Sequence, residues 1–219
     1  MSETKKIEVM ENILSENDTI AAEVNRAMTE KGIFVVNVMG APGAGKTSTL
    51  KQVIRRLHGL KPYVIEGDIE SDLDTVTLRA LGVETVQINT GGACHLDSPL
   101  IRKATEDLKL PSKGVLFIEN IGNLVCPAEF VIGEHVKLLI VTATDGSDKP
   151  YKYPLAFEKA DAILLNKVDL LPYVEFEELF FMNGVRALNK HAPVFKVSGK
   201  TGDGYDEVVR WIEQKAAEQ

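Results

Sequence analysis

The residues whose types and spacing best suit chemistry form one glycine-rich stretch. This stretch fits the phosphate-binding pattern G-x-x-x-x-G-K-[ST], and it consists of Gly40, Ala41, Pro42, Gly43, Ala44, Gly45, Lys46, Thr47 and Ser48. Glycines let successive backbone N–H groups face phosphate oxygens, and the N-terminus of a following helix adds partial positive charge. We expect Lys46 to reach the β- and γ-phosphates of a nucleoside triphosphate and the Thr47 hydroxyl to bind Mg²⁺.

A second motif, N-K-x-D, is formed by Asn166, Lys167 and Asp169 and indicates which base is bound. The Asp169 carboxylate can accept hydrogen bonds from the N1–H and 2-amino groups of guanine. Adenine would leave this carboxylate buried and unpaired, at a cost of roughly 1–3 kcal/mol. We expect Lys167 to lie along the base, Asn166 to connect this loop to the phosphate loop, and Ser198 and Lys200 to end the last strand beside guanine O6. The predicted nucleotide is therefore GTP, with GDP as product.

Acidic side chains follow two of the apolar runs. Glu119 ends the run 115–119, a position that holds Mg²⁺ directly or through water in phosphate-loop proteins. Gly122 can offer its N–H to the γ-phosphate, and Asp68 and Asp74 are candidates for binding Mg²⁺ or the attacking water. The alternative for the second acidic stretch is a solvated loop that caps the next helix. Many regulatory GTPases carry Asp and Gln where this chain has Glu119 and Asn123, so we expect slow hydrolysis.

The two cysteines of the chain offer a different chemistry. Cys94 and His95 follow a Gly-Gly pair, and Cys126 lies a few residues beyond Glu119. Lone cysteines are often inert core residues, and that alternative stays open. Two thiolates and an imidazole also suit Ni²⁺, Zn²⁺ or Cu⁺, but three ligands are too few for a closed tetrahedral site. A two-fold homodimer would double the ligand set and could close the site.

Apolar, β-branched runs alternate with helical patterns from residue 33 onward. This alternation predicts a three-layer α/β fold, with a mostly parallel central sheet covered by helices on both faces, as in phosphate-loop NTPases. Residues 5–31 predict one or two amphipathic helices, whose apolar stripe is interrupted at Asn17. The predicted strands are 33–39, 62–66, 84–88, 114–119, 136–142, 161–166 and 193–197, and the predicted helices are 46–58, 72–81, 98–109, 153–160, 174–190 and 204–217.

The length and composition indicate one globular domain. The 219 residues can bury a sizeable core, so we expect a single GTPase domain, 1–219, with the helical segment 1–31 packed on it. A net charge of −7 argues against nucleic-acid and membrane partners. The sequence contains no run of about 18 apolar residues, which is the length needed to span a bilayer. Its two cysteines are too few for a disulfide framework. We therefore expect a cytoplasmic protein.

The motifs in their order resemble one family closely. The chain contains the phosphate loop, E-G-D, N-T-G-G-x-C-H-L, E-N-I-G-N-L-V-C-P, N-K-x-D and S-x-K-T, and from Ile33 to Gln219 it resembles the hydrogenase nickel-incorporation GTPases of the HypB family. The resemblance implies a dimerising GTPase that helps deliver nickel to [NiFe]-hydrogenase, with a metal site of Cys94, His95 and Cys126 at the dimer interface. It also implies another maturation protein and the hydrogenase large subunit as partners.

Two features depart from the pattern of some members of that family. Some carry an N-terminal cysteine cluster or histidine-rich tract, and neither occurs before Gly40, so we do not expect nickel storage. Some also have a second histidine shortly after the Cys-His pair, where this chain has Asp97-Ser98-Pro99. We therefore do not rely on a dinuclear metal site.

Three other functions remain as alternatives. A urease-accessory nickel GTPase would carry a Cys-Pro-His signature, whereas here no proline separates Cys94 from His95. A phosphate-loop small-molecule kinase would need an arginine-rich lid and no N-K-x-D motif, and Arg79 and Arg102 stand isolated. A nucleotide-gated adaptor without catalysis of its own overlaps with a slow GTPase that acts as a switch.

Overall fold

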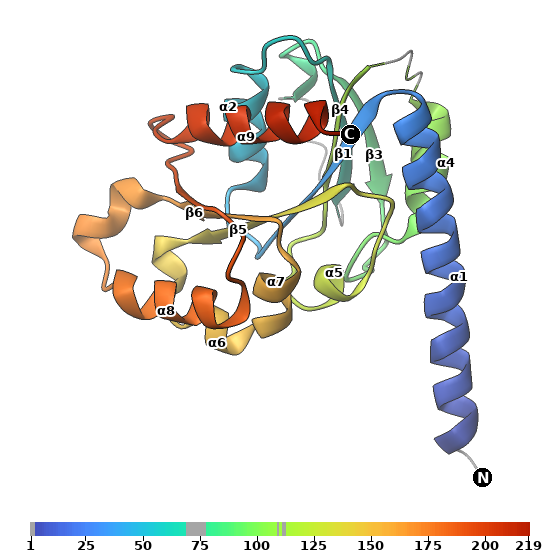
Figure 1. Cartoon of the computed structure of the whole chain (residues 1–219), viewed down its shortest axis with the longest axis horizontal. Coiled ribbons are helices and arrows are strands. Elements are labelled where there is room, and N and C mark those ends of the chain that lie inside the picture. The colour runs from blue at the N-terminus through green and yellow to red at the C-terminus, as the bar shows by residue number, and fades with distance from the viewer. Residues whose placement is uncertain (1–2, 69–77, 109, 111–112) are drawn as a thin grey trace.

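The computed structural model describes residues 3–68, 78–108, 110 and 113–219. Within these residues the centre is a seven-stranded sheet in the order β3-β2-β4-β1-β5-β6-β7, in which every neighbouring pair is parallel (Figure 1). The strands are β1 (Ile33–Gly40), β2 (Pro62–Asp68), β3 (Glu84–Asn89), β4 (Gly114–Glu119), β5 (Val136–Thr142), β6 (Ala162–Asn166) and β7 (Val194–Lys196). The predicted strands are thus confirmed, with ends shifted by at most two residues.

Helices cover both faces of this sheet, which explains the continuous apolar runs. In β1, Phe34, Val36 and Val38 belong to the core cluster that lies under α2 (Lys46–Ile54) and α9 (Tyr205–Ala217). Ile33 and Val35 point to the other face, toward the cluster under α1 (Glu3–Glu30) and α4 (Ser98–Asp107). The same alternation continues in β4, β5 and β6. The three-layer α/β prediction is therefore confirmed, because β1, β4, β5 and β6 bury both of their sides.

The remaining helices are short or differ from the predicted ranges. They are α5 (Cys126–Glu129), α6 (Lys149–Lys152), α7 (Pro154–Lys159) and α8 (Glu178–Leu188), with 3₁₀ turns η1 (Ala143–Asp145) and η2 (Val168–Tyr173). The range 46–58 was too long, because the helix ends at Ile54 and a turn leads toward β2. The range 174–190 was also too long, because the Glu177 N–H donates to Ser147 Oγ at 2.6 Å and the helix begins only at Glu178. Most of the predicted helix 72–81 lies outside the described residues.

The N-terminal segment forms one long helix, α1, whose first half extends beyond the rest of the molecule (Figure 1). Asn17, which interrupts the apolar stripe, is buried where α1 meets α4. Its Nδ2 donates to the Val131 carbonyl at 2.8 Å, and its Oδ1 accepts from the Ser98 N–H at 3.0 Å. This polar residue therefore anchors α1 to the first turn of α4. None of the helices in the described ranges combines the length and the apolar character needed to cross a membrane.

Candidate nucleotide and metal site

The phosphate-loop motif lies between β1 and α2, at the carboxyl edge of the sheet. Gly43 and Gly45 have φ angles of 74° and 88°, a left-handed conformation that side chains disfavour. A Cβ atom on Gly45 would lie 2.5 Å from Asn166 Nδ2, so only glycine allows the two loops to approach this closely. The loop therefore takes the tight backbone conformation that can surround an anion at the start of α2.

A cavity of about 520 Å³ opens beside this loop. It is lined by the phosphate loop, by the carboxyl ends of β2 and β4, by Gly122 and by Lys167. Lys46, Thr47 and Ser48 all face it, whereas Ala44 is buried under the loop. Lys46 Nζ lies 3.5 Å from the Ala41 carbonyl, within the loop itself. Strands far apart in the chain thus bring the predicted phosphate-binding residues to one hollow.

The oxygen atoms in this cavity suit Mg²⁺. The Thr47 hydroxyl donates to Glu119 Oε1 at 2.9 Å, and Glu119 is 6% exposed. A hydroxyl and a carboxylate are hard oxygen donors, so this pair fits the metal ion that accompanies nucleoside triphosphates. Asp68 ends β2, but its side chain lies outside the described part of the chain, as does the whole of Asp74.

Glu66 is a further acidic residue at this edge that was not predicted from the sequence. It is 2% exposed, lines the cavity and lies opposite Glu119 in the β2–β4 register. The sequence did contain a signal for this residue, because Glu66 follows an apolar run as Glu119 does. Its closeness to Glu119 depends on the pairing of β2 with β4, which no local pattern indicates.

The N-K-x-D segment begins at Asn166, the last residue of β6, and packs against the phosphate loop. Asn166 Nδ2 donates to the Ala44 carbonyl at 2.9 Å, and Asn166 Oδ1 accepts from the Gly199 N–H at 3.0 Å. Lys167 Nζ donates to the Gly43 carbonyl at 2.8 Å, while Asp169 Oδ1 accepts from Ser198 Oγ at 2.6 Å. Three loops that are distant in sequence therefore share one hydrogen-bonded arrangement.

The expected position of Ser198 and Lys200 needs one correction. They do not end the last strand, because β7 stops at Lys196. Ser198 is buried in the turn that follows, where its Oγ contacts Asp169, and Lys200 is exposed. The turn forms because the Gly202 N–H donates to the Ser198 carbonyl at 2.8 Å.

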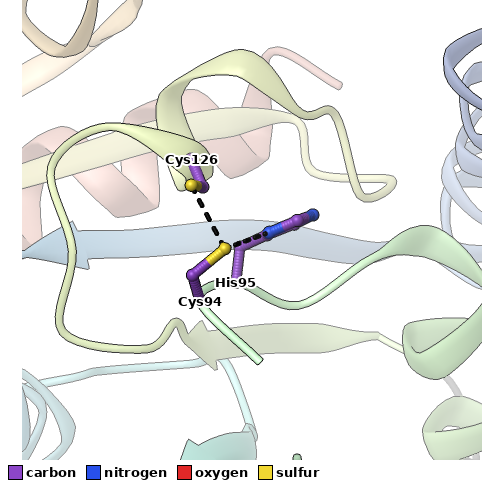
Figure 2. Close-up of side chains that lie close together, drawn as sticks. All are labelled: Cys94, His95 and Cys126. Atoms are coloured by element: carbon purple, nitrogen blue, oxygen red, sulfur yellow. Dashed lines mark hydrogen bonds between the residues drawn. The ribbon is translucent and has the colours of Figure 1, made fainter. Parts of the chain in front are cut away.

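Cys126 lies beside the adjacent residues Cys94 and His95 in the structure, although it is 32 residues from Cys94 in the sequence (Figure 2). Cys94 Sγ is 3.2 Å from Cys126 Sγ and 3.3 Å from His95 Nδ1. One candidate ligand atom from each residue lies within 4.8 Å of the others. Cys94 and His95 come from the loop after β3, and Cys126 begins α5. Two sulfur atoms and an imidazole at this spacing can hold a soft or borderline metal ion.

The surroundings change the protonation of this triad. Burial lowers the pKa of His95, although the nearby carboxylates of Asp97 and Glu129 act in the opposite direction. The neighbouring Cys94 sulfur, together with burial, raises the pKa of the Cys126 thiol. A neutral imidazole is the form that binds metal, whereas the Cys126 thiol must lose its proton when a metal ion arrives.

A buried lysine, Lys137, binds the backbone next to the triad, and the sequence patterns did not predict this role. Lys137 on β5 donates to the Phe130 carbonyl at 2.7 Å and to the Ala128 carbonyl at 3.4 Å, at the end of α5. Its ammonium also lies 3.3 Å from Glu134 Oε1. The Phe130 ring stacks on His95 with 4.0 Å between the ring centroids. Lys137 thus holds the backbone at the end of the helix that carries Cys126, including the residue whose ring stacks on His95.

Comparisons with known proteins agree with this combination of a phosphate loop and a Cys/His triad. Residues 34–196 match the family described as CobW/HypB/UreG, nucleotide-binding domain. The hydrogenase maturation factor HypB of Azotobacter chroococcum mcd 1 is 44% identical over 217 residues, which cover 98% of this chain and 71% of that protein. The chain belongs to the HypB family.

Solved HypB structures share its architecture. HypB from Helicobacter pylori, solved in complex with nickel, superposes with a TM-score of 0.88 at 34% identity and covers 93% of this chain and 96% of that one. HypB from Archaeoglobus fulgidus gives a TM-score of 0.86 at 33% identity, covering 93% and 100% of the two chains. The mostly parallel sheet with helices on both faces is therefore the HypB fold.

Proposed function

We propose that this chain is a slow GTPase that assists nickel insertion into [NiFe]-hydrogenase as a metallochaperone and switch. Its relatives are named hydrogenase maturation factors, and the HypB of Helicobacter pylori binds nickel in its solved structure. We expect it to act in the cytoplasm with another maturation protein and the hydrogenase large subunit.

The observation that carries this proposal is a loop shared by the two sites. The segment from Glu119 to Cys126 begins in the nucleotide cavity and ends at the metal triad. A Cβ atom on Gly122 would lie 2.9 Å from Pro42 Cα and 2.9 Å from Pro42 N, so the segment lies directly against the phosphate loop. A change at the γ-phosphate therefore has a short covalent route to Cys126.

The nucleotide chemistry follows from the residues around the cavity. Lys46 supplies a positive charge to the β- and γ-phosphates, and the Gly122 N–H donates to the γ-phosphate. Asp169 accepts from the guanine base, with Asn166, Lys167 and the turn of Ser198 and Lys200 holding its loop. When Mg²⁺ is bound by Thr47 and Glu119, with Asp68 and Asp74 as further candidates, it neutralises charge that develops on the phosphates. Asn123 in place of a water-orienting glutamine supports slow hydrolysis.

The cargo site is completed by a second copy of the chain. Cys94, His95 and Cys126 supply three ligands, whereas Zn²⁺ prefers four and Ni²⁺ accepts four or more. Cys94 is exposed, so a partner subunit can approach it. GTP-dependent formation of a homodimer would bring two triads together and would change the number of ligands around Ni²⁺ or Zn²⁺.

The test is a titration of Ni²⁺ and Zn²⁺ into protein loaded with Mg·GDP or with Mg and a non-hydrolysable GTP analogue. Cys94→Ala and Cys126→Ala should each lose binding by at least roughly tenfold, since each removes a ligand. His191→Ala, which removes an exposed histidine outside the triad, is the matched control and should bind as the unaltered chain does.

Two outcomes would contradict the proposed function. Undiminished metal binding in both cysteine variants would rule out the triad as the cargo site. Equal metal affinity with GDP and with the GTP analogue would rule out nucleotide control. Light scattering of the same samples should show a monomer with GDP and a dimer with the analogue. A monomer in both states would contradict the proposed GTP-dependent homodimer.

A further inference from the structure

Asn123 contacts every segment that the proposed switch must connect. Its backbone N–H donates to the Gly40 carbonyl at 3.1 Å, in the phosphate loop. Its side-chain Nδ2 donates to the Cys94 carbonyl at 3.1 Å. Its Oδ1 accepts from the Val125 N–H at 2.9 Å, immediately before Cys126. One residue thus holds the phosphate loop by its backbone and both cysteine-bearing segments by its side chain.

The bond to Val125 alone has a simpler explanation. Asparagine side chains often accept a hydrogen bond from the N–H two residues further along, which stabilises a turn. A local turn of this kind does not need the amide Nδ2, and a serine or aspartate could form it as well. The bond from Nδ2 to Cys94 reaches a segment that follows a different strand, so it serves a purpose beyond the turn.

A neighbouring asparagine shows which end of the metal loop is fixed. Asn120 is 1% exposed, and its Oδ1 accepts from the Leu96 N–H at 3.2 Å while its Nδ2 donates to Asn37 Oδ1 at 3.2 Å. These bonds tie Leu96 to β1 in the interior, not to the phosphate loop. Cys94, two residues before Leu96, is exposed, and its carbonyl accepts the bond from Asn123. A movement of Asn123 can therefore shift Cys94 against a fixed Leu96.

We propose that Asn123 is the positioning residue that couples the nucleotide to metal affinity, an inference that rests on the proposed function. Gly122 precedes it and meets the γ-phosphate, so any displacement of Gly122 on GTP binding or hydrolysis is passed to Asn123. Because its side chain bonds to both cysteine segments, that displacement changes the position of Cys94 relative to Cys126. By linkage, a bound metal ion must change nucleotide affinity by the same factor.

The test compares four proteins: the unaltered chain, Asn123→Ala, Asn123→Asp and Asn89→Ala. Asn123→Ala removes both side-chain bonds, whereas Asn123→Asp keeps the acceptor for Val125 and loses the donor to Cys94. Asn89 is the matched control, because its Oδ1 accepts from the Gly91 N–H in the same metal-bearing loop at 3.1 Å. The measurement is the ratio of the Ni²⁺ dissociation constants with Mg·GDP and with the GTP analogue, together with the affinity for each nucleotide with and without Ni²⁺.

In the unaltered chain we expect a ratio on the order of tenfold, within the usual range of allosteric coupling, and in both Asn123 variants a ratio within about twofold of one. Asn89→Ala should keep the full ratio even if its absolute Ni²⁺ affinity falls. A merely structural role of Asn123 would weaken binding in both nucleotide states and leave the ratio unchanged, which would overturn the inference. The inference would also be overturned if Asn89→Ala lost the difference in Ni²⁺ affinity between the two nucleotide states. A ratio of one in the unaltered chain would instead show that the proposed nucleotide control itself is wrong, and the inference would fall with it.

Discussion

The buried side chain of Asn166 offers the sharpest test of how the nucleotide site is held. Asn166 is 1% exposed and makes three hydrogen bonds, to the Ala44 carbonyl at 2.9 Å, the Lys167 N–H at 2.8 Å and the Gly199 N–H at 3.0 Å. Asn166→Ala removes all three. The phosphate loop, the base loop and the turn after β7 then lose the residue that they share.

The magnitude follows from the number of bonds and the burial of their partners. Each intramolecular hydrogen bond contributes roughly 1 kcal/mol, and water can satisfy part of the groups left behind, so we expect the free energy of unfolding to fall by about 3 kcal/mol. The loops must also be reordered when nucleotide binds. We expect this to cost about 1.4–2.8 kcal/mol of binding free energy, or tenfold to a hundredfold in GDP affinity.

The assay is denaturant unfolding of the nucleotide-free protein and calorimetric titration with GDP. Asn189→Ala is the matched control, because Asn189 makes a comparable set of bonds, among them donation to the Ala160 carbonyl at 2.8 Å and acceptance from the Ala192 N–H at 2.9 Å, and it does not line the nucleotide cavity. That variant should lose stability but keep its GDP affinity. The reasoning is refuted if Asn166→Ala unfolds more easily and still binds GDP as tightly as the control.

Three further predictions concern the base, the phosphates and pH. Asp169→Asn should lower GTP affinity by at least roughly 100-fold and raise affinity for xanthosine triphosphate, whose 2-oxo group needs a donor. Competition binding measures both affinities. An unchanged GTP affinity would contradict the assignment of Asp169 as the residue that binds guanine. Lys46→Ala should slow phosphate release by at least about 100-fold, and release at the unaltered rate would contradict its role on the phosphates. His135 Nδ1 accepts from the Val35 N–H at 2.9 Å, and burial lowers the pKa of His135. The unfolded chain therefore binds this proton more readily than the folded one, so stability should fall as pH drops below about 6.5. His135→Asn, whose amide oxygen can accept the same bond, should lose this part of the pH dependence in unfolding experiments, and an unchanged pH profile would show that His135 is not its source.

Local patterns in the sequence determined which elements form and where the phosphate loop lies. Continuous apolar runs such as 33–39 must be buried on both sides, so they predict a parallel sheet between helices. The glycine spacing from Gly40 to Gly45 allows a backbone conformation that few other sequences permit. Helix ends were less predictable, because contacts such as that between Glu177 and Ser147 decide them.

Tertiary structure alone decided which strand ends become neighbours. Cys94 follows β3 and Cys126 follows β4, yet β2 lies between these strands in the sheet, so their 3.2 Å approach depends on how both loops fold back. Glu66 adjoins Glu119 only because β2 pairs with β4. Lys137 reaches the Phe130 carbonyl from β5, a strand that the sequence predicted without assigning any role to this lysine. Such contacts join residues that are distant in the chain, and their geometry is set by the packing of the whole sheet rather than by any local pattern.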